Sequence, residues 1–157
     1  PVGNKNIYID SEDYIVMIVA GPNARKDYHY NETEELFYQL EGSITVFVQD
    51  EGKKVAMNLN AGDMYLHPAG VPHSPVRSEN SIGLVIEKKR NGESVKDGLL
   101  WFCDNCNHKL HEVYFELNDI EEDFLVHFKH FYNSEALRTC DKCGTLMETD
   151  PKFSDKK

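Results

Sequence analysis

The sequence predicts an all-β barrel or sandwich over most of the chain, followed by a smaller segment of mixed character. Between residues 7 and 87, short runs rich in β-branched and aromatic residues alternate with turn signals such as Gly21-Pro22-Asn23. Many short strands separated by regular turns are typical of these two architectures. The strand-like runs cover residues 15–20, 35–40, 43–48, 53–59 and 82–87.

The C-terminal segment begins after a polar connector at residues 88–93. It holds one further strand-like run, at residues 113–117, and apolar residues at helical spacing over residues 121–132. Ser134 is the expected N-cap of a second helical turn, and residues 150–157 are expected to form a frayed tail. We therefore divide the chain into a barrel at residues 1–90 and a C-terminal segment at residues 91–157 that packs on it.

Length and charge narrow the class of protein. A chain of 157 residues fits one ordinary domain with a small appendage, and no apolar run approaches the ~20 residues that span a bilayer. The net charge of −10 disfavours binding to nucleic acid or to an anionic membrane. An anionic small substrate would need a local cluster of arginines.

Four cysteines form two C-x-x-C pairs, namely Cys103, Cys106, Cys140 and Cys143. They could form two disulfides in a secreted protein, but nothing else in the sequence suggests secretion. The spacing favours one thiolate metal site in a reducing, cytoplasmic setting. Four thiolates fill the coordination shell of zinc or iron, so this site is expected to be structural.

Two further patterns resemble the paired motifs of the cupin family. The first is Gly21-x7-His29-x-Asn31-x3-Glu35-x6-Gly42, and the second is Gly62-x5-Pro68-x-Gly70-x2-His73. The resemblance implies a cupin double-stranded β-helix, or jelly roll. Two positions depart from the family pattern, because Asn31 stands where a second histidine is usual and Arg77 where asparagine is usual.

These departures leave His29, Glu35 and His73 as the candidate metal ligands. Two imidazoles and one carboxylate leave positions open, which is the pattern of non-haem iron(II) oxygenases. In a strand, residues an even number apart share a face, so Arg77 is expected beside His73 and Arg25 beside His29. Because an unpaired buried guanidinium is costly, these arginines imply an anionic partner such as a planar carboxylate.

A narrower resemblance covers nearly the whole chain. Residues 21–39, 62–66, 71–77 and 82–87 resemble the signature of the 3-hydroxyanthranilate 3,4-dioxygenase family. The start, residues 1–5, is similar too, and the cysteine pairs resemble the tail of its bacterial and fungal forms. The resemblance implies an enzyme that opens the ring of 3-hydroxyanthranilate with O2. The product, 2-amino-3-carboxymuconate semialdehyde, cyclises to quinolinate in the kynurenine pathway of NAD biosynthesis.

The same resemblance assigns roles to individual residues. His29, Glu35 and His73 would hold Fe(II), and the cysteines would hold a second Fe, or Zn, in a rubredoxin-like site. Arg25, Arg77 and Glu87 would be the catalytic residues and would orient the substrate and O2. Asn4 and Phe37 would complete the substrate site. A cytoplasmic homodimer is expected.

Three other readings compete with this one. Another metal-dependent cupin enzyme, such as an isomerase, commonly keeps the histidine that is missing at Asn31. A non-catalytic cupin ligand-binding module does not need an intact ligand set with inward arginines. A nucleic-acid-binding zinc ribbon is disfavoured by the charge of −10.

Overall fold

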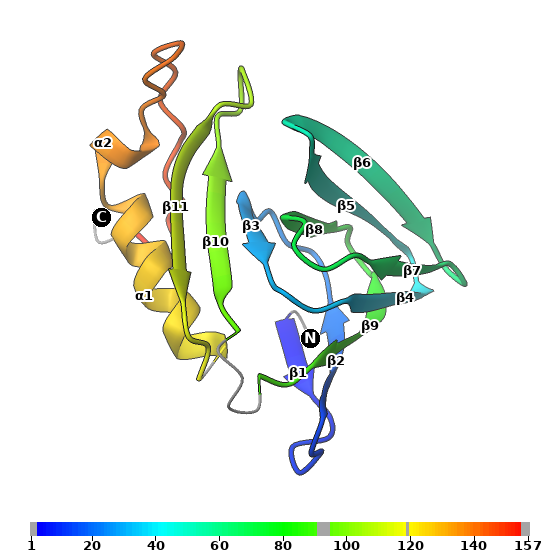
Figure 1. Cartoon of the computed structure of the whole chain (residues 1–157). Coiled ribbons are helices and arrows are strands. Elements are labelled where there is room, and N and C mark those ends of the chain that lie inside the picture. The colour runs from blue at the N-terminus through cyan, green and yellow to red at the C-terminus, as the bar shows by residue number, and fades with distance from the viewer. Residues whose placement is uncertain (1–2, 91–94, 119, 155–157) are drawn as a thin grey trace.

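The computed structural model describes residues 3–90, 95–118 and 120–154. Within these ranges the chain forms eleven strands and two helices (Figure 1). The helices are α1 (Ile120–Tyr132) and α2 (Glu135–Arg138). The strands are β1 (Gly3–Asn6), β2 (Tyr14–Ala20), β3 (Asp27–Tyr30), β4 (Glu35–Glu41), β5 (Ser43–Asp50), β6 (Lys53–Asn60), β7 (Met64–His67), β8 (His73–Arg77), β9 (Ile82–Lys88), β10 (Asp97–Phe102) and β11 (Lys109–Phe115).

The strands form two antiparallel sheets. The five-stranded sheet has the order β1-β2-β9-β4-β7, and the six-stranded sheet has the order β11-β10-β3-β8-β5-β6. This arrangement confirms the predicted all-β cupin barrel. Strands distant in the chain become neighbours, because β9 lies between β2 and β4 and β8 lies between β3 and β5. The two motifs therefore meet inside one barrel.

The first hydrophobic core lies between the two sheets and includes Phe37, Val46 and Val85, which are 1%, 0% and 3% exposed. Along β4 the side chains alternate, so that Glu35, Phe37 and Gln39 are buried while the residues between them are only partly buried. The expected two-residue period of this strand is confirmed. It places polar groups and the core on the same inward face.

A second hydrophobic core fastens α1 to β10 and β11. Trp101 of β10 stacks on Phe131 of α1 with the ring centroids 4.3 Å apart. Trp101 pairs with Asp27, and Leu99 pairs with His29, so both lie on the side of the sheet that carries His29. The helix expected at residues 121–132 is confirmed, as is the N-cap, since Ser134 Oγ accepts from Leu137 N at 3.3 Å.

Three expectations about the C-terminal segment need correction or qualification. The strands β10 and β11 do more than pack on the barrel, because they extend its six-stranded sheet from β3. The tail is not frayed at Phe153, whose ring stacks on Tyr132 at 5.7 Å, although residues 155–157 lie outside the described residues. The polar connector includes a buried side chain, because that of Arg90 is only 5% exposed; residues 91–93 lie outside the described residues. Across the described ranges, no helix has the length and apolar character that crossing a membrane requires.

Candidate metal centre

Three buried side chains converge between the sheets: His29 from β3, Glu35 from β4 and His73 from β8. One ligand atom of each lies within 4.8 Å of the others. His73 Nε2 is 3.0 Å from Glu35 Oε2, and the rings of His29 and His73 are 5.4 Å apart. We call this set the His2Glu cluster.

The sheet register explains the convergence. His29 and His73 are direct cross-strand partners of β3 and β8, so both imidazoles stand on one face of the six-stranded sheet. Glu35 reaches them from the five-stranded sheet that faces it. The parity expected for β8 is confirmed, because His73 pairs with Val48 and Arg77 pairs with Ile44, and both partners belong to the core.

The environment of Glu35 favours its ionised form. Burial opposes ionisation, but the charge and hydrogen bond of His73, with His29 beside them, outweigh it and lower the pKa of Glu35 to about 2. Asn31 Nδ2 donates to Glu35 Oε2 at 3.2 Å. Asn31 therefore donates a hydrogen bond to a candidate ligand, at the position where the usual cupin motif has a second histidine. Two imidazoles and one buried carboxylate form a donor set that could hold a divalent metal ion.

A buried hydrogen-bond network surrounds the His2Glu cluster. His29 Nε2 donates to Asp97 Oδ1 at 2.7 Å, and Arg90 Nη2 donates to the same oxygen at 2.5 Å. Arg90 Nη1 also donates to Glu87 Oε2 at 2.6 Å. Carboxylates that accept from a metal-binding histidine fix its ring and tautomer. The roles of Arg90 and Asp97 were not predicted from the sequence, because no local pattern around either residue indicates a buried ion pair.

Glu87 is 2% exposed, so it is not a surface residue at the end of a strand. It is the cross-strand partner of Glu35 on β9 and β4. Burial, followed by the charge of Glu35, raises the pKa of Glu87 even though Arg90 opposes the shift. Two neighbouring carboxyl groups thus have pKa values displaced in opposite directions, which is a recurring feature of acid–base sites.

The two candidate arginines have different surroundings. Arg77 Nη1 is buried and has no hydrogen-bond partner among the described residues. Burial, followed by the charge of Arg25, lowers the pKa of Arg77 to about 10. Arg25 precedes β3, so strand parity does not place it, and its guanidinium pairs with Asp27. The argument from an unpaired buried cation therefore applies to Arg77 alone.

Aromatic and rim residues complete the surroundings. Phe37 contacts His73 edge-on at 5.8 Å, and Phe124 of α1 contacts His29 edge-on at 5.2 Å. Phe124 was expected only as part of a helical face. Asn4 is exposed on β1 and pairs with Val19, whose side chain faces the barrel interior. Asn4 is thus at the rim of the inner face.

His67 is the other buried histidine near the His2Glu cluster, with its ring 4.2 Å from that of His73. Its Nε2 donates to Val71 O at 2.7 Å, and its Nδ1 accepts from Tyr65 at 3.0 Å. Burial and the neighbouring His73 lower the pKa of His67 to about 4. Both ring nitrogens of His67 therefore have protein partners, so His67 is a histidine satisfied within the core.

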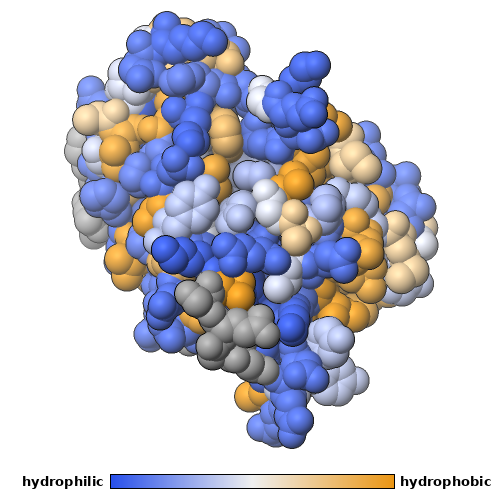
Figure 2. All heavy atoms as spheres, in the orientation of Figure 1, coloured by the Kyte–Doolittle hydropathy of each residue, from blue (hydrophilic) through white to orange (hydrophobic). Residues whose placement is uncertain are grey.

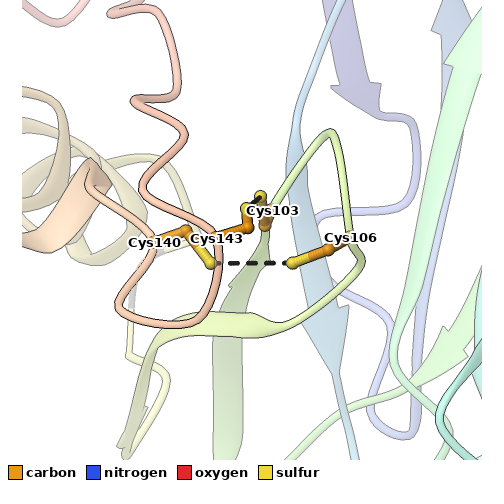
Figure 3. A group of neighbouring side chains, drawn as sticks. All are labelled: Cys103, Cys106, Cys140 and Cys143. Atoms are coloured by element: carbon orange, nitrogen blue, oxygen red, sulfur yellow. Dashed lines mark hydrogen bonds between the residues drawn. The ribbon is translucent and has the colours of Figure 1, made fainter.

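The four cysteines come together at the ends of two similar turns (Figure 3). Cys103 Sγ lies 3.6 Å from Cys143 Sγ, and Cys106 Sγ lies 3.6 Å from Cys140 Sγ. An S–S bond is ~2.05 Å long. Sulfurs that bind one metal at ~2.3 Å in a tetrahedron are ~3.8 Å apart. The geometry fits a shared metal and does not fit two disulfides. We call this set the cysteine cluster.

The backbone builds both turns in the same way. Asn107 N donates to Cys103 O at 2.9 Å, and Gly144 N donates to Cys140 O at 2.8 Å. Asn107 and Gly144 both have positive φ, 55° and 74°, which glycine and asparagine adopt at least cost. Cys103 follows the end of β10, about 13 Å along the strand from the residue that pairs with His29. The two clusters therefore share no ligand.

Comparison with known proteins places the chain in a family. The family described as 3-hydroxyanthranilic acid dioxygenase matches residues 1–132. The 3-hydroxyanthranilate 3,4-dioxygenase of Xanthomonas campestris pv. campestris is 54% identical over 98% of this chain and 86% of its own length. The enzyme of that name from Bacillus cereus is 44% identical over 94% and 82%.

Among solved structures, a cupin-2 domain containing protein from Shewanella frigidimarina is 26% identical, with a TM-score of 0.47. The match covers 55% of this chain and 80% of that one. The length of the sequence matches decides the assignment. The family match includes both cupin-like motifs, and the alignment with the Xanthomonas enzyme also extends over both cysteine pairs of this chain. The chain therefore belongs to the 3-hydroxyanthranilic acid dioxygenase family.

Proposed function

We propose that this protein is an iron(II)-dependent dioxygenase that cleaves the ring of 3-hydroxyanthranilate between carbons 3 and 4. Both atoms of O2 enter the product, 2-amino-3-carboxymuconate semialdehyde, which loses water as it cyclises to quinolinate, a precursor of NAD. The observation that carries the proposal is the buried His2Glu cluster together with Arg77 Nη1, which lies in the same interior and has no partner within the described ranges. Relatives that bear this activity in their names support it.

Iron(II) held by His29, Glu35 and His73 would supply the redox and Lewis-acid chemistry that brings the aromatic ring and O2 together. The residues around it would select and orient the substrate. Arg77 offers its Nη1 to the ring carboxylate, which suits the planar guanidinium fork. Phe37 and Phe124 contact the two histidines and limit access of water.

Glu87 is the residue we assign to proton transfer. The pKa of Glu87 is raised by burial, which brings the group toward the range in which it can exchange a proton near neutral pH. Its Oε2 accepts from Arg90, so Oε1 is the oxygen we expect to take the proton of the substrate hydroxyl. Arg25, held by Asp27, would orient O2 from the side of β3, and Asn4 would close the rim.

We assign a structural metal, iron or zinc, to the cysteine cluster, and a cytoplasmic homodimer to the assembled enzyme. The outer face of the five-stranded sheet supports a dimer. Met64 and Leu66 of β7 are 62% and 55% exposed, and Leu40 of β4 is 38% exposed. Figure 2 shows apolar atoms gathered on the side where β4 and β7 lie. Sedimentation of the wild-type protein and of Leu66→Glu tests this interface. The substitution should weaken the dimer, and a dimer of unchanged stability would contradict this interface.

One assay tests the activity. Protein reconstituted anaerobically with Fe(II) is mixed with 3-hydroxyanthranilate in air-saturated buffer, and the absorbance of the semialdehyde is followed with O2 uptake. We expect one O2 consumed for each substrate opened. Binding without O2 uptake would support the alternative of a non-catalytic cupin module. Turnover of other substrates alone would support a different metal-dependent cupin enzyme.

A further inference from the structure

A glycine on the inner face of β9 lies beneath the guanidinium of Arg77. Gly83 pairs with Gln39 of β4 on one side and with Val19 of β2 on the other. Directly paired residues of antiparallel strands share a face, and both of these partners are buried. Gly83 therefore faces the barrel interior, at a position where a strand normally places a side chain.

Two polar groups occupy the space above Gly83. A Cβ at this position would lie 2.9 Å from Arg77 Nη1 and 3.0 Å from Gln39 Oε1. Arg77 belongs to the six-stranded sheet, so its side chain crosses the barrel to reach β9 in the other sheet. A side chain at position 83 would compete with both groups for this space. The Arg77 guanidinium can therefore lie here only because residue 83 has no side chain.

Both polar atoms are unsatisfied within the described ranges. Arg77 Nη1 and Gln39 Oε1 are buried, and neither has a hydrogen-bond partner there. The amide of Gln39 is fixed at its other end, because Nε2 donates to Glu41 O at 2.6 Å. A buried donor and a buried acceptor without partners are costly, and such groups are retained where a ligand or an alternative geometry satisfies them.

We propose that Gly83 and Gln39 are positioning residues that set the place of the Arg77 guanidinium, and through it the preference for a substrate that carries a carboxylate. The inference rests on the proposed function, in which Arg77 binds the ring carboxylate. With glycine at position 83 the guanidinium lies back against β9. A larger residue displaces it, so that its planar fork no longer meets the carboxylate in the same geometry.

Gly83→Ala is the primary test. The added methyl group meets the ends of two side chains at the closest distances, with the Tyr38 carbonyl oxygen farther away at 3.4 Å, so the variant should fold. Two compounds are compared, 3-hydroxyanthranilate and 2-aminophenol, which lacks the carboxylate. The ratio of their kcat/KM values should fall about tenfold or more, the size expected for one disturbed charge-assisted contact. Iron content and kcat/KM for 2-aminophenol should change little.

A merely structural defect would lower both kcat/KM values together and leave their ratio unchanged. An unchanged ratio in Gly83→Ala therefore overturns the proposal. Gln39→Leu, which keeps the volume but removes Oε1, should give a smaller fall in the ratio. In an Arg77→Ala background, Gly83→Ala should cause no additional fall in the ratio; the same fall with and without Arg77 would also overturn the proposal.

Gly98→Ala is the matched control. It also adds a methyl group to a barrel strand, where the Cβ would meet the Tyr114 ring at 2.8 Å. Gly98 lies on the opposite face of β10 from Asp97 and Leu99, so the ratio should not change. A fall equal to that of Gly83→Ala would assign the effect to general strain and overturn the proposal.

A readout without turnover separates this inference from the proposed function. If the wild-type protein opens neither compound, the proposed function fails, but the place of Arg77 can still be measured. Labelling by p-hydroxyphenylglyoxal, followed by peptide mass spectrometry, reports how accessible this guanidinium is. Gly83→Ala should increase the labelling rate of Arg77 several-fold. An unchanged rate would show that Gly83 does not determine its position.

Discussion

The His2Glu cluster lies inside the barrel, with all three of its residues buried, whereas the cysteine cluster lies beyond the end of β10 and Cys143 is exposed. Three donors from two sheets make the first cluster, and its neighbourhood includes Arg77 Nη1, which has no hydrogen-bond partner among the described residues. Four donors from two local turns make the second, and backbone hydrogen bonds fix both turns. The first arrangement leaves room for chemistry, and the second leaves none.

The comparison also shows how differently the two clusters depend on the rest of the fold. The cysteine turns need only to be brought together. The His2Glu cluster needs the register of β3 with β8, the approach of β4 and the network through Arg90 and Asp97. A substitution in the barrel should therefore affect activity, and a substitution in the cysteine turns should affect stability.

The largest effect is expected from removing a barrel ligand. His29→Ala or His73→Ala should abolish turnover and catalytic metal binding, because three ligands are the fewest that form this open site. Metal analysis should show that each variant loses the barrel metal and keeps the cysteine-bound one. Normal turnover with full iron at the barrel site would refute the ligand assignment.

Cys140→Ser should have the opposite pattern. Loss of one thiolate should release the metal of the cysteine cluster and destabilise the C-terminal region by several kcal/mol, because metal binding there contributes to folding. Hydrogen exchange should rise in α2 and in the two turns. Most ring-cleaving activity should remain when iron is supplied. A folded variant that retains barrel iron but has no turnover would mean that the cysteine cluster takes part in electron transfer.

Within the barrel, the two arginines should differ. Arg77→Ala should raise KM for 3-hydroxyanthranilate by a factor that corresponds to ~1.5–3 kcal/mol, because the buried Nη1 of Arg77 has no partner in the described part of the chain and can bind a carboxylate. Arg25→Ala should mainly lower kcat, because Arg25 is already paired with Asp27 and is assigned to orient O2 rather than to bind the carboxylate. Steady-state kinetics separate the two. Unchanged substrate affinity in Arg77→Ala would exclude a carboxylate contact at this residue.

The smallest effect concerns the second core, which joins the barrel to the C-terminal segment. Burial, followed by the neighbouring His130, lowers the pKa of His111 below its ordinary value near 6.5. At a pH between the two pKa values of His111, the unfolded chain therefore binds a proton on this ring and the folded chain does not. The stability from the neutral ring is present at higher pH and is lost as pH falls through 6.5, by well under the limit of ~1.4 kcal/mol per pH unit, because solvent screens this partly exposed ring.

His111→Phe is the matched variant for this effect, because it keeps an aromatic ring against Trp101, 5.8 Å away. Urea unfolding at pH 7.5 and 5.5 should show a larger loss of stability in wild type than in this variant. Equal losses would show that other groups cause the acid sensitivity.

Much of the site could be predicted because its signals are local. The two-residue period of a strand placed Arg77 beside His73, and the register of β8 with β5 agrees. Each C-x-x-C pair contains a complete half of the cysteine cluster. The periodic apolar residues after Glu121 predicted α1. In each of these cases, backbone geometry over a few residues determines which side chains share a face.

The amino-acid sequence by itself thus determined the family, the types of the candidate metal ligands and the faces of the strands that carry them. Only the tertiary structure decided which strands became neighbours. That choice brought Asp97 to His29, Arg90 to Glu87, Phe124 to the edge of the His2Glu cluster and Arg77 to Gly83. Strand period fixes the direction of a side chain but not its partner, because cross-sheet contacts depend on register and on packing between segments far apart in the chain.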